Sequence, residues 1–178
     1  MKSDLLNFFF SLIMGIIQIE HRINCFRVFP YDKFIMLDVD LKFRIDISEL
    51  FQQFKNFGPD QMIGVAPDLA PHYRIAFRDF RALNPDTQVG QPGPMQGFNT
   101  GVVLYDFGRM RSNVKFNQYI DDHLNSTSEL AAKYLFRSHL GDQCFFTLLG
   151  MEHSGEETMM SSFSYSIQWA PLNGITLG

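Results

Sequence analysis

The stretch Phe34-Ile35-Met36-Leu37-Asp38-Val39-Asp40 decides how the rest of the chain is interpreted. Its first four residues form a continuous apolar run, which is typical of a strand buried on both faces of a parallel sheet. The run ends abruptly in two carboxylates separated by one residue. Ligands of open α/β sheets bind at the carboxyl ends of strands, and residues two apart on an extended strand point the same way. Asp38 and Asp40 are therefore predicted to converge on one hard cation, Mg²⁺ or Mn²⁺, that bridges to a substrate diphosphate.

Two later segments carry polar residues close to predicted strands or helices. The glycines of Gly97-Phe98-Asn99-Thr100-Gly101 allow close backbone approach to a ligand, and Asn99 can hydrogen-bond to sugar hydroxyls. His139-Leu140-Gly141-Asp142-Gln143 places a carboxylate and an amide just before a helix. Each motif alone has a simpler interpretation: the Asp-x-Asp as a surface turn or cap, the glycine segment as a structural turn, and Asp142 as a helix N-cap.

Strands and helices are predicted to alternate along the chain, which argues for α/β layers. Besides 34–37, apolar runs predict strands at 62–66 and 101–105. Ser48 is the predicted N-cap of the first helix after the Asp-x-Asp motif, and Gly150 the predicted end of the last helix. Residues 84–97 are rich in proline and glycine and predict a loop long enough to be a functional flap. Helical periodicity predicts helices at 49–54, 71–83, 129–136 and 143–149, and from residue 107 onward.

The size and composition fit one domain of this kind. The chain has 178 residues, of which 46% are apolar, enough for a substantial core. A net charge of −4, with Lys and Arg scattered singly, argues against a nucleic-acid partner. Cys25 and Cys144 form no metal-ligand pair, and they permit a disulfide without predicting one. Asn125-Ser126-Thr127 is an N-glycosylation sequon, which agrees with a secretory compartment.

Three segments are predicted along the chain. Residues 1–24 are mostly apolar and form either a signal-anchor, which would associate with a membrane, or a buried or interfacial helix. Residues 25–153 hold the alternating strands and helices. Residues 154–178 are rich in Ser, Met and Gly, have no clear periodicity, and are predicted to be a divergent tail.

Taken in order, the motifs resemble those of glycosyltransferase family 8. The resemblance is carried by Leu37-Asp38-Val39-Asp40-Leu41, Gly97-Phe98-Asn99-Thr100-Gly101-Val102 and Leu140-Gly141-Asp142-Gln143, and it extends from about Phe34 to His153. It implies a three-layer α/β/α sandwich of the A-type glycosyltransferase kind, truncated at both ends relative to the family. A longer match is similar to the xylosyltransferases of that family: Lys42-Phe43, Glu49-Leu50-Phe51, Phe57, Ile63-Gly64, Tyr73-Arg74, Phe136-Arg137 and Gly150-Met151-Glu152-His153.

The resemblance implies a retaining transferase that uses a UDP-sugar, in particular UDP-xylose, together with Mn²⁺, or Mg²⁺ in its place. The acceptor would be a xylose-glucose O-glycan on EGF-like repeats, in the lumen of the endoplasmic reticulum or Golgi. The family pattern places Asp38 and Asp40 on the metal and Asp142 and Gln143 beside the reacting sugar carbon. The donor- or acceptor-binding residues that it implies are Asp38, Val39, Asn99, Thr100, Gly101, Leu140 and Gly141.

Two features of the family have no counterpart in the sequence. One is a first β-α unit that holds the base and ribose of the nucleotide, and the other is a third metal ligand, a C-terminal histidine; no histidine follows His153. Two alternatives therefore stay open: a catalytically inactive relative, and a divalent-metal phosphotransferase or hydrolase that would use Lys42 and Asp46 as well. Front-face substitution and a covalent route through Asp142 are both compatible with retention.

Overall fold

The computed structural model describes residues 19–39, 41–43, 46–68, 70–91, 96–137, 141–152 and 175–176. Its central sheet has the strand order β1-β4-β3, formed by β1 (Lys33–Leu37), β4 (Phe98–Asp106) and β3 (Ile63–Pro67). The predicted strand at 34–37 is confirmed and is buried. Its neighbour, however, is antiparallel: β4 runs against both β1 and β3, which are parallel to each other. The prediction of a parallel neighbour was wrong, because an apolar run indicates burial but carries no information about pairing direction.

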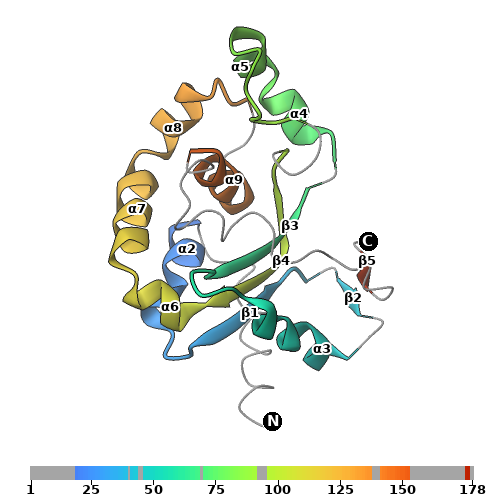
Figure 1. The fold of residues 1–178 in the computed structure, drawn as a ribbon, viewed down its shortest axis with the longest axis vertical. Coiled ribbons are helices and arrows are strands. Elements are labelled where there is room, and N and C mark those ends of the chain that lie inside the picture. Colours follow the sequence, from blue (N-terminus) through green and yellow to red (C-terminus); the bar gives the residue numbers. More distant parts are fainter. Residues whose placement is uncertain are drawn as a thin grey trace.

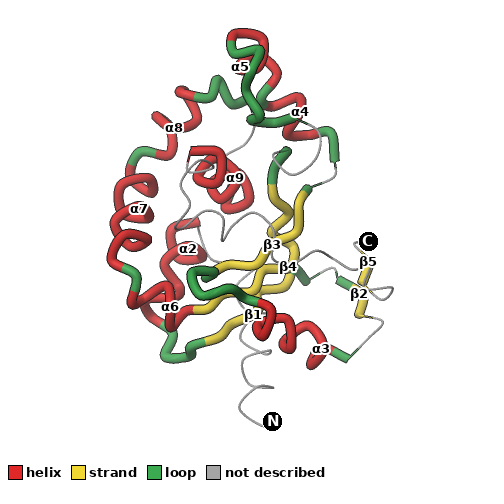
Figure 2. Tube along the Cα trace, in the orientation of Figure 1, coloured by secondary structure: helices red, strands yellow, loops and turns green. Residues whose placement is uncertain are grey.

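The register of the sheet places the carboxyl ends of β1 and β3 along the first half of β4. Leu37, the last residue of β1, pairs with Val102, and Pro67, the last residue of β3, pairs with Phe98 near the start of β4. The carboxyl end of β3 therefore lies beside the amino end of β4, whereas β1 ends beside the middle of β4. Figure 2 shows the three strands side by side.

Helices cover both faces of the sheet, which confirms the three-layer α/β/α sandwich (Figure 1). One face packs on α2 (Ile19–Val28), α6 (Phe107–Ser112), α7 (Val114–Asn125) and α9 (Asp142–Glu152). The opposite face packs on α3 (Ile47–Gln52) and the following 3-10 helix Gln53–Asn56, where Leu50 and Phe54 meet Ile35 and Leu104.

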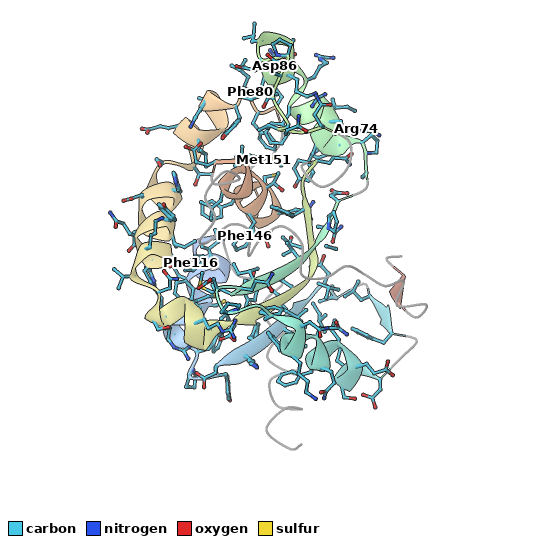
Figure 3. The ribbon with its side chains drawn as sticks, in the orientation of Figure 1. Arg74, Phe80, Asp86, Phe116, Phe146 and Met151 are labelled. Atoms are coloured by element: carbon cyan, nitrogen blue, oxygen red, sulfur yellow. The ribbon has the colours of Figure 1, made fainter. Side chains whose placement is uncertain are left out.

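Helix α9 lies between the sheet and a second apolar cluster. Residues 144–151 are all buried, as expected for a helix surrounded by protein. Phe146 packs toward the sheet, whereas Met151 belongs to the cluster formed with α4 (His72–Ala76) and α8 (Thr127–Lys133); Figure 3 labels both residues. Gly150 lies inside α9, so the prediction that it ends the helix was wrong.

Other predicted elements differ at their boundaries. The helix predicted at 71–83 is interrupted at Phe77, which separates α4 from α5 (Arg78–Leu83). The third predicted strand is longer than its apolar run and begins at Phe98, and the helix predicted at 129–136 is α8, which spans 127–133. In the loop predicted at 84–97, no helix or strand occurs among the described residues 84–91 and 96–97.

The cap of α3 is Asp46 and not Ser48. The Asp46 carboxylate accepts a hydrogen bond from the Ser48 backbone N–H at 2.8 Å. This bond satisfies one of the open N–H groups of the first turn and holds the pKa of Asp46 below its usual range. Asp46 has the extended backbone of an N-cap residue, whereas Ser48 already lies inside the helix.

The chain termini contribute to the fold where they are described. Helix α2 crosses the predicted boundary between residues 24 and 25, and its Ile23 and Phe26 are buried in the main core. No helix among the described residues is long and apolar enough to span a membrane. Residues 1–18, on which most of the predicted signal-anchor falls, lie outside the described part. From the predicted divergent tail, β5 (Ile175–Thr176) pairs antiparallel with β2 (Lys42–Phe43). Cys25 and Cys144 are buried and no disulfide joins them.

A hydrogen-bonded group joins α8 to α9 and makes stability sensitive to alkaline pH. The Tyr134 hydroxyl donates to Glu152 Oε2 at 2.9 Å, and Lys133 Nζ donates to the same carboxylate at 2.6 Å. Burial, and then the bond to Glu152 and its charge, raise the pKa of Tyr134 above its ordinary value.

A raised pKa in the folded state contributes stability below the unfolded pKa of about 10 and loses it as the pH rises further. The free energy of unfolding is therefore expected to fall above pH 10, with Tyr134 contributing about 1.4 kcal/mol per pH unit. Denaturant unfolding between pH 9 and 11.5 should show a shallower decline for Tyr134→Phe. An unchanged slope in that variant would contradict the assignment.

Candidate functional site at the sheet edge

The first predicted motif lies where β1 ends. Asp38 follows the strand directly and is exposed, and its backbone N–H donates to the Gly101 carbonyl of β4 at 2.9 Å. Val39 lies in a turn and is 72% exposed, so the alternation of side chains along an extended strand does not reach beyond Leu37. Asp40, the second predicted metal ligand, lies outside the described residues.

The second motif forms the first part of β4. Thr100 is buried, and Asn99 Oδ1 accepts from the Gly101 backbone N–H at 2.9 Å, a local bond that uses one of its two acceptor positions. The pairing with β3 shifts register here: Val65 pairs with Val103 and Ala66 with Asn99, so the extra residues of this bulge-like shift lie on β4. Bulges commonly re-aim side chains at sheet edges.

The third motif meets the second through one side chain. Gln143 Oε1 accepts from the Thr100 backbone N–H at 3.1 Å, although the two residues are 43 positions apart. Asp142 is the first residue of α9, and the Gly141 carbonyl accepts from Phe145 N–H at 2.9 Å. Gly141 is thus the N-cap of α9 and Asp142 its first helical residue. A carboxylate at this position interacts favourably with the positive end of the helix dipole. Leu140 and His139 lie outside the described residues.

Two polar residues that the sequence did not single out complete this edge. Asp68 follows β3 and is buried, with its Oδ2 accepting from Gln143 Nε2 at 3.4 Å. Gln96, also buried, donates from Nε2 to the Asp68 carbonyl at 2.8 Å. The available signal for Asp68 was its place directly after a buried strand, the same place that Asp38 has after β1.

Gly97 has a packing role in the described structure. A Cβ at this position would overlap the ring of Tyr73, so glycine here permits the close approach of an aromatic side chain. The Tyr73 hydroxyl lies 3.8 Å from Cys144 Sγ. Burial raises the pKa of Tyr73, and side-chain hydrogen bonds with Thr147 and Gln143 oppose that rise.

The side chains described at this edge offer oxygen ligands of the kind that bind hard cations. Asp38 supplies an exposed carboxylate at the end of β1, beside Gly101 of β4, and oxygen donors of this kind are preferred by Mg²⁺ and Mn²⁺. Within the described ranges, no group of three or more His, Cys, Asp or Glu side chains could hold a metal ion. Asp40, His139 and His153 fall outside those ranges.

Comparisons with known proteins point to one class of enzyme. No protein-family model matches the chain. The sequence is 46% identical to mouse xyloside xylosyltransferase 1 over 123 residues, which is 68% of this chain and 31% of that protein. It is also 46% identical to the human protein of that name over 121 residues, or 67% of this chain and 30% of that protein. The crystal structure of apo mouse xyloside xylosyltransferase 1 matches with a TM-score of 0.68 at 41% identity, covering 76% of this chain and 48% of that one. The chain thus spans about a third of the length of the curated relatives that it matches.

Proposed function

Because the chain belongs to glycosyltransferase family 8 and has the A-type fold, we propose that it transfers a sugar from a nucleotide-sugar donor to a glycan acceptor. The observation that carries the proposal is the meeting of the three motifs at one sheet edge. Asp38 N–H donates to the Gly101 carbonyl, and Thr100 donates to Gln143. Ligands of α/β folds bind at such an edge, outside the carboxyl ends of strands.

The finer proposal concerns the substrates. The relatives are named for transfer of xylose to a xyloside, which supports UDP-xylose as donor. We propose a xylose-glucose O-glycan on EGF-like repeats as acceptor, retention of the anomeric configuration, and Mn²⁺ as the metal, with Mg²⁺ able to replace it.

Each proposed site residue has a distinct task. Asp38 and Asp40 would hold the divalent metal, which when bound neutralises charge on the departing diphosphate. Asp142 and Gln143, at the start of α9, would lie beside the reacting sugar carbon. The remaining proposed contacts to donor or acceptor come from Val39, Asn99, Thr100, Gly101, Leu140 and Gly141.

Calorimetry with UDP-xylose, with and without Mn²⁺, tests the proposal. We expect Mn²⁺-dependent binding that weakens about 10–100-fold or more in the Asp38→Asn/Asp40→Asn variant, because the cation loses both carboxylates. Asp86→Asn is the matched control, since Asp86 is an exposed carboxylate in the turn after α5 (Figure 3). It should bind like the unmodified chain.

Other outcomes separate the alternatives. Thermal stabilisation by inorganic phosphate with no preference for UDP would instead indicate a phosphotransferase or hydrolase. A cooperatively folded chain with no response to UDP-xylose and Mn²⁺ would identify an inactive relative.

A lumenal location in the secretory pathway is part of the proposal and has its own test. The sequon lies where α7 meets α8, with Ser126 Oγ donating to the Asp122 carbonyl at 2.7 Å. When the chain is expressed in eukaryotic cells without an added leader, we expect glycosylation at Asn125, seen as a gel shift removed by peptide N-glycosidase. Asn125→Gln and Thr127→Ala should lose the shift. Ser126→Ala should keep it, because the middle position of the sequon is not read. An unshifted parent chain would count against lumenal entry.

A further inference from the structure

The Gln143 amide is held by two groups of opposite hydrogen-bonding character. Its Oε1 accepts from the Thr100 backbone N–H at 3.1 Å and from the Thr100 hydroxyl at 3.4 Å. Its Nε2 donates to Asp68 Oδ2 at 3.4 Å. A backbone N–H can only donate and a carboxylate can only accept, so a flipped amide would lose its bonds with the Thr100 backbone and with Asp68. The surroundings therefore select one orientation of Gln143.

Asp68 is fixed by contacts that do not involve Gln143. Its Oδ1 accepts from the Ala70 backbone N–H at 2.8 Å, and its own N–H donates to the Gly97 carbonyl at 2.8 Å. Its carbonyl accepts from Gln96 Nε2 at 2.8 Å, and the residue is only 8% exposed. The carboxylate therefore reaches Gln143 from a segment that is hydrogen-bonded on both sides.

We propose that Asp68 is a positioning residue that orients Gln143 so that its amide nitrogen, and not its carbonyl oxygen, serves the ligand. Thr100 engages the oxygen twice, so Nε2 is the end of the amide that has a hydrogen to share. One of its hydrogens meets Asp68, and the other is shared with the Tyr73 hydroxyl, a neutral partner, and is the polar group that Gln143 can turn to a ligand. That hydrogen suits an oxygen acceptor, such as a sugar hydroxyl or a phosphate oxygen. The identity of this ligand rests on the proposed function, whereas the orientation of the amide does not.

Exchanging the carboxylate of residue 68 and the amide of residue 143 tests whether Asp68 orients Gln143 or only stabilises the fold. In Asp68→Asn, the oxygen that bonds Ala70 is kept and an NH₂ group replaces Oδ2, so two donors face each other at Gln143. In Asp68→Asn/Gln143→Glu, the new NH₂ group donates to the new carboxylate, which still accepts from Thr100. The double variant restores the bonds with residue 68 and Thr100 but has no amide hydrogen to offer to Tyr73 or to a ligand.

Three quantities are measured: the thermal midpoint, the ¹H–¹⁵N signals of the Gln143 side-chain amide, and the turnover of UDP-xylose with Mn²⁺. The amide signals are assigned by their loss in Gln143→Glu. We expect Asp68→Asn to shift the Gln143 signals and lower kcat about tenfold or more, with KM much less affected. The double variant should recover the thermal midpoint but not kcat.

Unchanged Gln143 signals in Asp68→Asn would overturn the proposal, and so would recovery of both midpoint and kcat in the double variant. If the unmodified chain neither binds nor turns over the donor, the proposed function fails. In that case the amide signals and the thermal midpoints still decide whether Asp68 orients Gln143.

Discussion

An alanine at Gly150 is expected to lower the free energy of unfolding by about 1–3 kcal/mol. A Cβ at this position would overlap the ring of Phe98, where α9 packs on β4. The helix has no free side toward which it could shift, because residues 144–151 are all buried. The loss is expected even though alanine is intrinsically the better helix former by about 1 kcal/mol. Denaturant unfolding followed by circular dichroism should show a lower midpoint with an unchanged slope.

Gly141 provides the matched control, because it stands at the other end of the same helix and an added Cβ there meets nothing within 4 Å. Gly141→Ala should change the free energy of unfolding by less than about 1 kcal/mol. Adding Phe98→Leu to Gly150→Ala should recover part of the loss, since the two side chains share one space. Equal losses in the two glycine variants would argue against the packing explanation.

The sequence predicted strand β1 correctly but placed the end of helix α9 wrongly, and the two cases show what local sequence can predict of the fold. The run at 34–37 predicted β1 because four consecutive apolar residues need burial on both faces. Gly150 was predicted to end α9 because glycine is a poor helix former, but the contact with Phe98 requires a glycine inside the helix. Tertiary packing of this kind has no local signal, so it overrides propensity without warning.

The same limit applies to the candidate site. Asp38, Thr100 and Gln143 were identified from the order of their motifs, and the described structure brings them to one sheet edge. Asp68 was missed, because a single carboxylate after a strand is common and its partner Gln143 lies 75 positions away. Site residues that belong to a recognisable motif could thus be predicted from the sequence. Asp68, which contacts Gln143 across the fold, could be found only in the structure.

Thr147 connects the stability of α9 with the geometry of the site. It lies one helical turn after Gln143, and Gly150 follows on the same face, so one stripe of the helix meets the start of β4. Thr147 is fully buried, and its Oγ1 accepts from the Phe98 backbone N–H at 3.2 Å. This bond holds α9 at one position along the axis of β4, and therefore holds Gln143 at one position relative to Thr100.

Thr147→Val should lower the free energy of unfolding by about 1–3 kcal/mol, because it keeps the volume but leaves the Phe98 N–H buried without an acceptor. Thr147→Ser keeps the hydroxyl and should lose only about 0.8 kcal/mol for one buried methyl group. Amide hydrogen exchange separates the two causes: exchange at Phe98, measured at equal global stability, should be faster in the valine variant and unchanged in the serine variant. Equal protection of Phe98 in both would mean that packing, and not this hydrogen bond, holds α9 in register with β4 and Gln143 against Thr100.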